Sequence, residues 1–368
     1  DLICRVKFIV AACILVSALG GDTVQTAQLF SKEIENDPDN VDAILDAGIN
    51  LISTANNHTY DRGYDGLERT IRVLEQKGLP YIGTSLPGQP RPEAYYFEKE
   101  GTKFAVISYT YDTNYKESGG DCLPEGKYEG TVNMLCRPGS GIYLPGVYRG
   151  SNWIQRLFVK LKFVKDTNTA GKVAKFFGMT VTYSRHDDRL EGKVDTLYIE
   201  QLQQDIRTAK EKADLVLFYP HVGGQFNIKP GAFTEYVIDK ALEAGADAVI
   251  ATHAHIFWQN VVPLAYCLGN FNMNPKSYLA MPEILTDYGY ALHLYVEDQR
   301  IQKVTFSMMK NCIMPDGQIA SCPIDELYVS LKSEKEKKQL EKDVCHLYGR
   351  ITGKILTGEI IRREYEMK

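Results

Sequence analysis

Cysteine is scarce in this chain, with eight cysteines spread over 368 residues. That number is too small for a disulfide scaffold in a chain of this length. No Cys-x-x-Cys pair occurs, which argues against a zinc site made of cysteines. Cys122 with Cys136, and Cys312 with Cys322, lie near glycine and proline. Each pair is expected to be able to close a disulfide in an oxidising compartment.

The sequence also lacks an excess of positive charge. Its formal net charge is −5 at pH 7 and its pI is about 5.9, which argues against nucleic-acid binding as its main task. A hydrophobic content of 44% is enough to bury a large core. These values predict one large α/β domain with an insertion, or two smaller domains.

The apolar run at residues 8–19 (FIVAACILVSAL) is too short to span a bilayer comfortably, because about 20 apolar residues are needed. It follows Arg5 and Lys7 and precedes Gly20-Gly21, which resembles a short signal-peptide core with a cleavage point. The alternative is a buried first strand of the sheet. The sequence leaves both interpretations open.

Histidine is rare as well, with seven in the chain, yet four histidines follow apolar runs. Residues 49–55 run into Asn56-Asn57-His58, residues 213–220 into His221, and residues 246–252 into His253-Ala254-His255. Ligands bind outside the carboxyl ends of strands in α/β sheets, so we expect these side chains to share a cleft. Neutral imidazole is the commonest metal ligand, and the repeated pattern predicts metal binding or catalysis. Any one of them alone is equally well an ordinary core histidine.

Apolar periodicity predicts alternating helices and strands, which favours a mixed or largely parallel sheet covered by helices. Helices are expected at residues 38–47, 66–77, 199–213 and 231–244, strands at 81–84 and 103–111, and a hairpin at 288–296 and 301–308. Gly78 is expected to end the second helix, and Gly269 to allow a tight bend. Residues 333–343 predict a charged helix with a solvated surface.

Four motifs together resemble the CapA family of bacterial capsule, or poly-γ-glutamate, synthesis proteins. They are Ala55-Asn56-Asn57-His58 with Asp61-x-Gly63-x-x-Gly66, His221-x-Gly223-x-Gln225, residues 244–250 with His253-x-His255, and Leu268-Gly269-Asn270-Phe271. The resemblance covers residues 42–297 with an interruption in the middle. It implies a calcineurin-like metallophosphatase fold, of α/β class, in which helices flank mixed β-sheets and a cap region is inserted.

The resemblance also implies roles for these residues. Asn57, His221, His253 and His255 are expected to bind metal. Mixed nitrogen and oxygen ligands suit Mn, Zn or Fe, and the sequence does not choose among them.

Catalysis is expected to involve His58, acting as an acid or a transition-state donor. Asp61 is its expected partner, because a carboxylate fixes the tautomer of an imidazole. The alternative for Asp61 is an ordinary turn or helix-start aspartate. Asn56 and Asn270 are expected to bind substrate, although Gly-Asn after a strand is also an ordinary bend.

The departure from the family lies at the amino end, where the family has a strand ending in Gly-Asp and later an Asn-Leu-Glu. Asp1 and Asp22 are the two candidates for the missing carboxylate ligand, and no Asn-Leu-Glu is present. If residues 8–19 are removed as a signal core, Asp1 is removed with them. A two-metal centre needs anionic bridging ligands. The sequence therefore leaves open whether the site binds one or two divalent ions.

The chain divides into four expected parts. They are the N-terminal half of a CapA-like domain at 1–111, a cap at 112–197, the C-terminal half at 198–310, and a helical extension at 311–368. Residues 149–175 are basic, with apolar residues at helical spacing. Such a segment is expected to lie on an anionic membrane or to guide a polyanion toward the cleft. The alternative is a cap packed on the domain with a solvated lysine face.

Two functions follow from the resemblance. One is a metal-dependent hydrolase that uses metal-activated water on a phosphoester or a γ-glutamyl amide bond. The other is a non-catalytic accessory protein that binds or exports an anionic capsular polymer, next to a membrane-bound polymer synthase. The intact histidines favour the hydrolase and the altered amino end favours the accessory protein. Both place the protein in the cell envelope, outside the cytoplasm.

Overall fold

The structure is a computed structural model of the chain. It describes residues 4–8, 39–46, 49–113, 126–137, 144–145, 173–176, 179–182, 186–187, 196–224, 230–254, 264–265, 267–270, 274–276, 285–315 and 317–367. Asp1, Asp22 and His255 lie outside these ranges, as does nearly all of the basic segment at 149–175.

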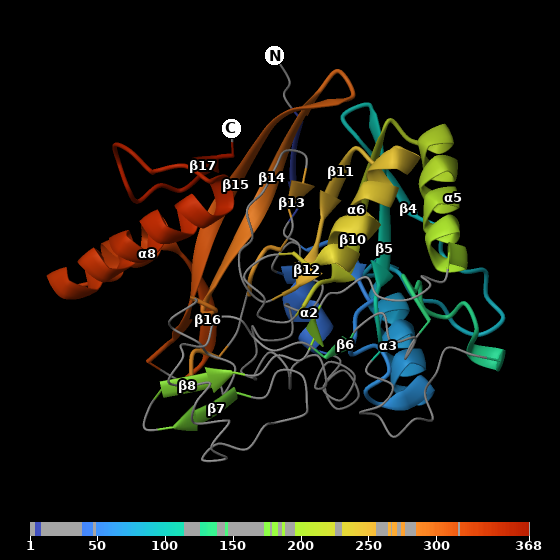
Figure 1. Ribbon diagram of the computed structural model, residues 1–368, viewed down its shortest axis with the longest axis horizontal. Coiled ribbons are helices and arrows are strands. Elements are labelled where there is room, and N and C mark those ends of the chain that lie inside the picture. The colour runs from blue at the N-terminus through green and yellow to red at the C-terminus, as the bar shows by residue number, and fades with distance from the viewer. Residues whose placement is uncertain are drawn as a thin grey trace.

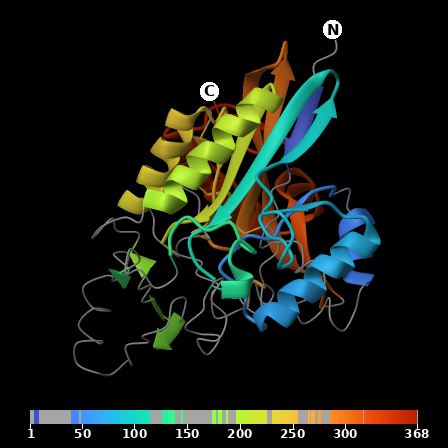
Figure 2. The ribbon, with the colours of Figure 1, turned by 90° about the vertical axis from the view of Figure 1, so that its right-hand side faces the viewer.

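Two β-sheets and two groups of helices form four layers. In Figure 1 α8, the five-stranded sheet and the six-stranded sheet follow one another from left to right, with α6 drawn over the six-stranded sheet and α5 to its right. Figure 2 shows α5 and α6 together on one side of the six-stranded sheet. The predicted α/β class with mixed sheets flanked by helices is therefore confirmed.

The six-stranded sheet carries most of the predicted site. Its order is β13-β11-β10-β5-β4, and β12 also pairs with β10. The bounds are β4 Tyr95–Lys99, β5 Thr102–Thr110, β10 Leu215–Val222, β11 Ala248–Ile250, β12 Thr252–His253 and β13 Leu264–Ala265. Strand β10 pairs in parallel with β5, β11 and β12, and all its residues are buried. Such burial on both faces is typical of the centre of a parallel sheet.

The five-stranded sheet is antiparallel. Its strands are β1 Cys4–Phe8, β14 Tyr288–Glu297, β15 Arg300–Ile313, β16 Ile319–Pro323 and β17 Tyr365–Glu366. Strands β14 and β15 form the hairpin that the sequence predicts. A strand does lie at the amino end, where β1 spans residues 4–8 and pairs with β14. Residues 9–19 lie outside the described ranges, so both interpretations of residues 8–19 stay predictions.

Alternate residues of β10 face different layers. Leu215 and Leu217 belong to a core cluster shared with β14 and β15, whereas Val216 and Phe218 pack in a second cluster with α5 (Thr196–Lys212) and α6 (Ala232–Ala244). Full burial of one such side chain stabilises the fold by about 1.5–3 kcal/mol. Because successive side chains point to opposite faces of β10, this strand packs against the five-stranded sheet on one side and against α5 and α6 on the other.

A small unit stands beside these sheets. It contains α2 (Asp39–Asp46), α3 (Gly63–Lys77), and the parallel pair β2 (Ile52–Ser53) and β3 (Tyr81–Ile82). Helix α3 begins three residues before the predicted start and ends, as predicted, at Gly78, whose φ of 68° is left-handed.

The C-terminal segment forms α7 (Ile324–Ser330) and α8 (Glu334–Thr352). The expectation of a simple solvated surface at residues 333–343 is wrong for one face of α8. Leu340, inside that range, is buried in the core cluster of both sheets, as are Val344 and Leu347 just beyond it. These residues recur at helical spacing, and the charged residues between them hide the pattern.

The remaining described elements lie in residues 126–187. They are the short 3-10 helix η2 (Gly126–Tyr128), the pair β6 (Leu144–Pro145) with β9 (His186–Asp187), and the pair β7 (Val173–Phe176) with β8 (Met179–Thr182). Among the residues that the structure describes, no helix is long and apolar enough to cross a membrane.

The two cysteines of the β15–β16 pair are free thiols. Cys312 is paired with Ala320, and Cys322 with Lys310, so the cysteines are diagonal neighbours. Diagonal neighbours lie about 7–8 Å apart, whereas a disulfide usually needs Cα atoms within about 4.4–6.8 Å. Burial raises the pKa of the Cys312 thiol to about 12, and Cys322 adds to the shift. In this structure the two cysteines are neighbouring thiols, and the disulfide that the sequence allows in an oxidising compartment stays a prediction. Cys136 is free and buried, and Cys122 lies outside the described residues.

Candidate functional site

His221 is at the centre of the predicted site. It is the second-last residue of β10, with Thr110 of β5 on one side in the register and Thr252 of β12 on the other. Its side chain is buried, with 1% of the residue exposed. The prediction that a buried strand delivers this histidine at its carboxyl end is confirmed.

His253 comes to the same place from the neighbouring strand. Its φ is 107°, a left-handed value that a residue with a side chain rarely adopts. Such a conformation costs about 1–3 kcal/mol and persists where the surroundings enforce it, often at functional sites. The rings of His253 and His221 have centroids 4.7 Å apart and are inclined at 54°.

Asn57 comes from a different sheet. Strand β2, which precedes it, pairs with β3 and not with the six-stranded sheet. The Asn57 Oδ1 atom nevertheless lies 2.9 Å from His221 Nε2. The expected meeting of the three strand ends therefore occurs, but only two of the strands belong to one sheet.

Close contact holds the small unit against the large sheet. The hydroxyl groups of Ser53 and Ser108 are hydrogen-bonded to each other. Gly83, with a φ of 101°, lies so close to Ala55 that an added Cβ would be 2.5 Å from the Ala55 Cβ. Only glycine fits there without a shift of the backbone. This close approach fixes the segment that leads to Asn57.

His58 and Asp61 form a pair in the turn that follows. His58 Nδ1 lies 2.7 Å from Asp61 Oδ2, and the Asp61 side chain is 4% exposed. Asn56 Oδ1 accepts a hydrogen bond of 2.8 Å from the His58 backbone N–H. The predicted contact between His58 and Asp61 is present, and the Asn56 side chain shapes the turn. Their roles in catalysis and substrate binding stay predictions.

Asn270 is 2% exposed and lies beside the five-stranded sheet. The side-chain Nδ2 of Asn270 donates a hydrogen bond of 2.8 Å to the backbone carbonyl of Thr286, and the backbone carbonyl of Asn270 accepts one of 3.2 Å from Asn311 Nδ2. Gly269 has a φ of 73°, as the predicted tight bend requires. These contacts hold the bend in place, and substrate binding by Asn270 stays a prediction.

Two further side chains contact the histidines and were not predicted from the sequence, because they carry hydroxyl groups in place of imidazole rings. The Tyr111 hydroxyl lies 2.9 Å from His253 Nε2, and the Thr252 hydroxyl lies 3.1 Å from His221 Nδ1. Tyr111 follows the end of β5, and Thr252 directly precedes His253. Their position at strand ends adjacent to β10 is the signal that would have found them.

An ion pair between the partly buried Arg91 and the buried Asp205 braces β5 close to Tyr111. Arg91 donates hydrogen bonds of 2.7 and 2.6 Å to the two carboxylate oxygens of Asp205, and one of 2.9 Å to the Tyr109 hydroxyl. Burial raises the pKa of Tyr109 well above its ordinary value. Burial lowers the pKa of Arg91, but the hydrogen bond with Asp205 and the other contacts more than offset this, so its pKa is raised. The network keeps the carboxyl half of β5 in place.

The amide oxygen of Asn57 and the imidazole nitrogens of the site are atoms that bind metal cations. Asn57 Oδ1 accepts only, so the 2.9 Å contact with His221 Nε2 needs a proton on that nitrogen or a cation between the two lone pairs. Amide oxygen and imidazole nitrogen fit Mn, Zn or Fe. Within the described ranges no three His, Cys, Asp or Glu side chains cluster as a metal site. Asp1, Asp22 and His255 lie outside those ranges.

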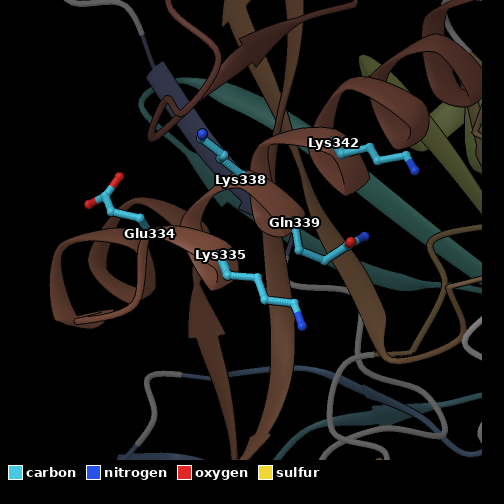
Figure 3. A pocket seen from close by; sticks show the side chains of 5 residues that line it. All are labelled: Glu334, Lys335, Lys338, Gln339 and Lys342. Atoms are coloured by element: carbon cyan, nitrogen blue, oxygen red, sulfur yellow. The ribbon is translucent and has the colours of Figure 1, made fainter.

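One cavity, of about 460 Å³, lies elsewhere, on α8. It is lined by Glu334, Lys335, Lys338, Gln339 and Lys342. Figure 3 shows the three lysine amino groups pointing in different directions, so they do not converge on one anion. No predicted site residue lines this cavity.

Comparisons with known proteins agree with the sequence motifs. The family model of the bacterial capsule synthesis protein PGA_cap matches residues 17–275. That family has a metallophosphoesterase-like fold, as the resemblance implied.

Two relatives and one solved structure are similar. The uncharacterized protein y4sH of Sinorhizobium fredii is 23% identical over 239 residues, 61% of this chain and 49% of that protein. The capsule biosynthesis protein CapA of Bacillus anthracis is 22% identical over 237 residues, 63% of this chain and 42% of that protein. The chain thus spans about half the length of these relatives or less. A hypothetical protein from Thermus thermophilus shares 13% identity at a TM-score of 0.41, over 83% of this chain and 99% of that chain.

Proposed function

The chain belongs to the bacterial capsule synthesis protein family PGA_cap, and we propose that it is a metal-dependent hydrolase within that family. The proposed substrate is a phosphoester or a γ-glutamyl amide bond. The observation that carries this proposal is the meeting of Asn57, His221 and His253 at the carboxyl ends of adjacent strands, with a strained backbone at His253.

The proposed metal ligands are Asn57, His221, His253 and His255, with Asp1 or Asp22 as the anionic ligand. A bound divalent cation of Mn, Zn or Fe, as one or two ions, would supply a Lewis acid that activates water. Asp61 holds a proton on His58 Nδ1 through their 2.7 Å contact. Proton exchange with the leaving group therefore falls to His58 Nε2.

The alternative is a non-catalytic accessory protein that binds or exports an anionic polymer. The observation that favours it is that the described ranges supply no carboxylate next to His221 and His253. Under either function we propose an extracytoplasmic place in the cell envelope, with an anionic polymer and a membrane-bound polymer synthase as partners.

The first experiment measures binding of Mn²⁺ and Zn²⁺ by calorimetry to protein purified without chelators. We expect at least one tightly bound ion per chain, and we expect His221→Ala to lose it. His346→Ala is the matched control, because His346 is exposed on α8 and bonds Arg350.

The metal-loaded protein is then assayed on two chromogenic substrates, a nitrophenyl phosphodiester and a γ-glutamyl anilide. Turnover of one of them that His58→Gln abolishes supports the hydrolase and names the bond. If the wild type binds metal no better than His221→Ala and turns over neither substrate, the hydrolase is wrong and the accessory role is the better account.

A further inference from the structure

Residues 131–136 form a buried segment that lies between the small unit and the six-stranded sheet. On one side, Val132 pairs with Thr84 in an isolated antiparallel bridge. On the other side, Met134 pairs in parallel with Thr110, the last residue of β5. The segment therefore joins the two parts of the chain that meet at the candidate site.

Asn133 makes the backbone contacts that connect the two sides. Its N–H donates a hydrogen bond of 2.9 Å to the carbonyl of Gly83, the glycine that packs against Ala55. Its carbonyl accepts one of 2.8 Å from the Thr110 N–H. Because the contact of Gly83 with Ala55 fixes the segment that leads to Asn57, one residue ties that segment to the end of β5.

The Asn133 side chain is hydrogen-bonded at both of its polar atoms. Its Nδ2 donates to the carbonyls of Pro92 and Ser108, at 3.0 and 3.1 Å. Its Oδ1 accepts a hydrogen bond of 3.0 Å from Arg91. A rotation of this amide would leave buried polar groups unsatisfied, so the side chain has one favoured orientation. Asn133 is therefore a fixed point between β5 and the small unit.

Thr131 extends this connection to the turn that carries His58 and Asp61. The Tyr60 hydroxyl is hydrogen-bonded to the Thr131 hydroxyl, and Tyr60 is 0% exposed. The Thr131 hydroxyl gives its one proton to the Tyr128 carbonyl, at 2.7 Å, so Tyr60 is the donor in the bond with Thr131. Since Tyr60 lies between His58 and Asp61 in the chain, its anchored side chain holds the turn from the inside.

We propose that Thr131 is a positioning residue, which holds the turn of His58 through Tyr60. Asn133 ties the same segment to β5, so the turn keeps a fixed distance from the strands that carry the other site residues. The inference rests on the proposed function, in which His58 exchanges a proton with the leaving group. Residues 131–136 belong to the part of the chain that is expected to form the cap, and this piece of it is built into the site.

The position of His58 bears directly on the rate, because misplacing a reacting group by about 1 Å can slow a reaction by about 100-fold. We therefore expect Thr131→Val to lower kcat of the metal-loaded protein by about 10–100-fold. KM and Mn²⁺ affinity should stay near the wild-type values, since valine leaves the backbone pairing of residues 131–136 unchanged. Thr131→Ser should restore kcat, because serine keeps the hydroxyl that accepts from Tyr60.

The direct test needs neither metal nor substrate. In the turn, the backbone N–H groups of Thr59, Asp61 and Gly63 donate hydrogen bonds of 3.2, 3.2 and 2.9 Å to backbone carbonyls. Amide hydrogen exchange reports how often such bonds open. We expect Thr131→Val to speed exchange at residues 59–63 by about tenfold, since it leaves a buried hydroxyl without its acceptor. Exchange in α8 serves as the reference for global stability, and Thr131→Ser should return the turn to the wild-type rate.

Thr70→Val is the matched control. Thr70 is buried in the same small unit, and its hydroxyl donates a hydrogen bond of 2.9 Å to the Gly66 carbonyl within α3. The variant removes a buried threonine hydroxyl, as Thr131→Val does, but at a place that does not contact the turn. Exchange at residues 59–63 and kcat should therefore stay at the wild-type values.

Three results overturn the inference. The first is unchanged exchange at residues 59–63 in Thr131→Val, and the second is an equal increase there in Thr70→Val. The third is a wild-type kcat in Thr131→Val although exchange in the turn is faster. If Thr131→Val does not fold, Tyr60→Phe removes the same hydrogen bond from the other side and is read in the same way. If the wild type turns over neither chromogenic substrate, the proposed hydrolase fails, whereas the exchange rates still decide whether Thr131 holds the turn.

Discussion

The Asp61 carboxylate oxygen Oδ2 lies 2.7 Å from Nδ1 of His58, three residues earlier in the chain. This contact forms inside one tight turn, in which the Asp61 N–H also donates to the His58 carbonyl at 3.2 Å. The orientation of the His58 ring therefore depends on a local structure that a substitution can change without disturbing the sheets.

Asp61→Asn is expected to lower kcat of the metal-loaded protein by about 10–100-fold, because an amide stabilises the protonated imidazole less than a carboxylate does. Metal content and KM should stay near the wild-type values. The measurement is steady-state kinetics on the substrate identified above. Asp65→Asn is the control, since Asp65 is exposed in the first turn of α3. Equal losses in both variants would contradict a special role for Asp61.

Arg91→Met is expected to lower the free energy of unfolding by about 3–5 kcal/mol, because it leaves the buried Asp205 carboxylate without its ionic partner. Asp205 is 3% exposed and accepts two hydrogen bonds from the guanidinium. Urea unfolding measures the loss. Lys212→Met removes the partner of Glu93 in an exposed pair and should change stability little. A small effect of Arg91→Met would mean that water enters the network.

Gly83→Ala is expected to destabilise the protein more than Gly88→Ala does. Both positions have positive φ, of 101° and 78°, and share the cost of about 1–3 kcal/mol for a side chain there. Only at Gly83 would the new Cβ collide with Ala55, at 2.5 Å. Thermal unfolding compares the two variants. Ala55 lies two residues before Asn57, so Gly83→Ala should also weaken metal binding. Equal destabilisation would show that the segment moves aside freely.

Tyr288 makes stability depend on alkaline pH. Burial raises its pKa above the ordinary value of 10.0, and Asp343, which accepts its hydrogen bond at 2.8 Å, raises it further. The unfolded chain therefore loses this proton near pH 10 while the folded protein keeps it. The stabilising contribution is complete below pH 10 and falls as pH rises further, by up to about 1.4 kcal/mol per pH unit.

In Tyr288→Phe this proton is absent, so the stability difference between wild type and variant should shrink above pH 10. The loss of the hydrogen bonds to Asp343 and Lys310 lowers the stability of the variant at neutral pH and does not mimic that slope. Denaturant unfolding between pH 8 and pH 11 measures both effects. Parallel curves for the two proteins would refute the prediction.

Elements with strong local signals are predictable from the sequence alone. Helix α3 has an apolar stripe and a terminal glycine, and the β14–β15 hairpin has two apolar runs around a polar turn. The partners of β2 were not predictable, because a parallel pair with β3 depends on contacts that no local pattern encodes. The buried face of α8 was missed because lysine and glutamate surround its four apolar core positions.

The site likewise contains residues that the sequence predicts and residues that it does not. The motif residues His58, His221 and His253 were found because imidazole is a rare and chemically distinctive group. Tyr111 was not found, since a tyrosine at the end of an apolar strand is usually a core residue. Its contact with His253 spans 142 positions of the chain and becomes visible only when β5 and β10 lie side by side.

The core cluster between the two sheets also bears on where this chain can be shortened. The match to the family model ends at residue 275, but the cluster that covers β5 and β10 continues into β14, β15, α8 and Met367. A version of the protein cut at the family boundary would present the apolar side chains of β10, such as Leu215 and Leu217, to water. The end of the family match is therefore not the end of the folded domain. Expression of the shorter piece is expected to give aggregated protein and no folded domain.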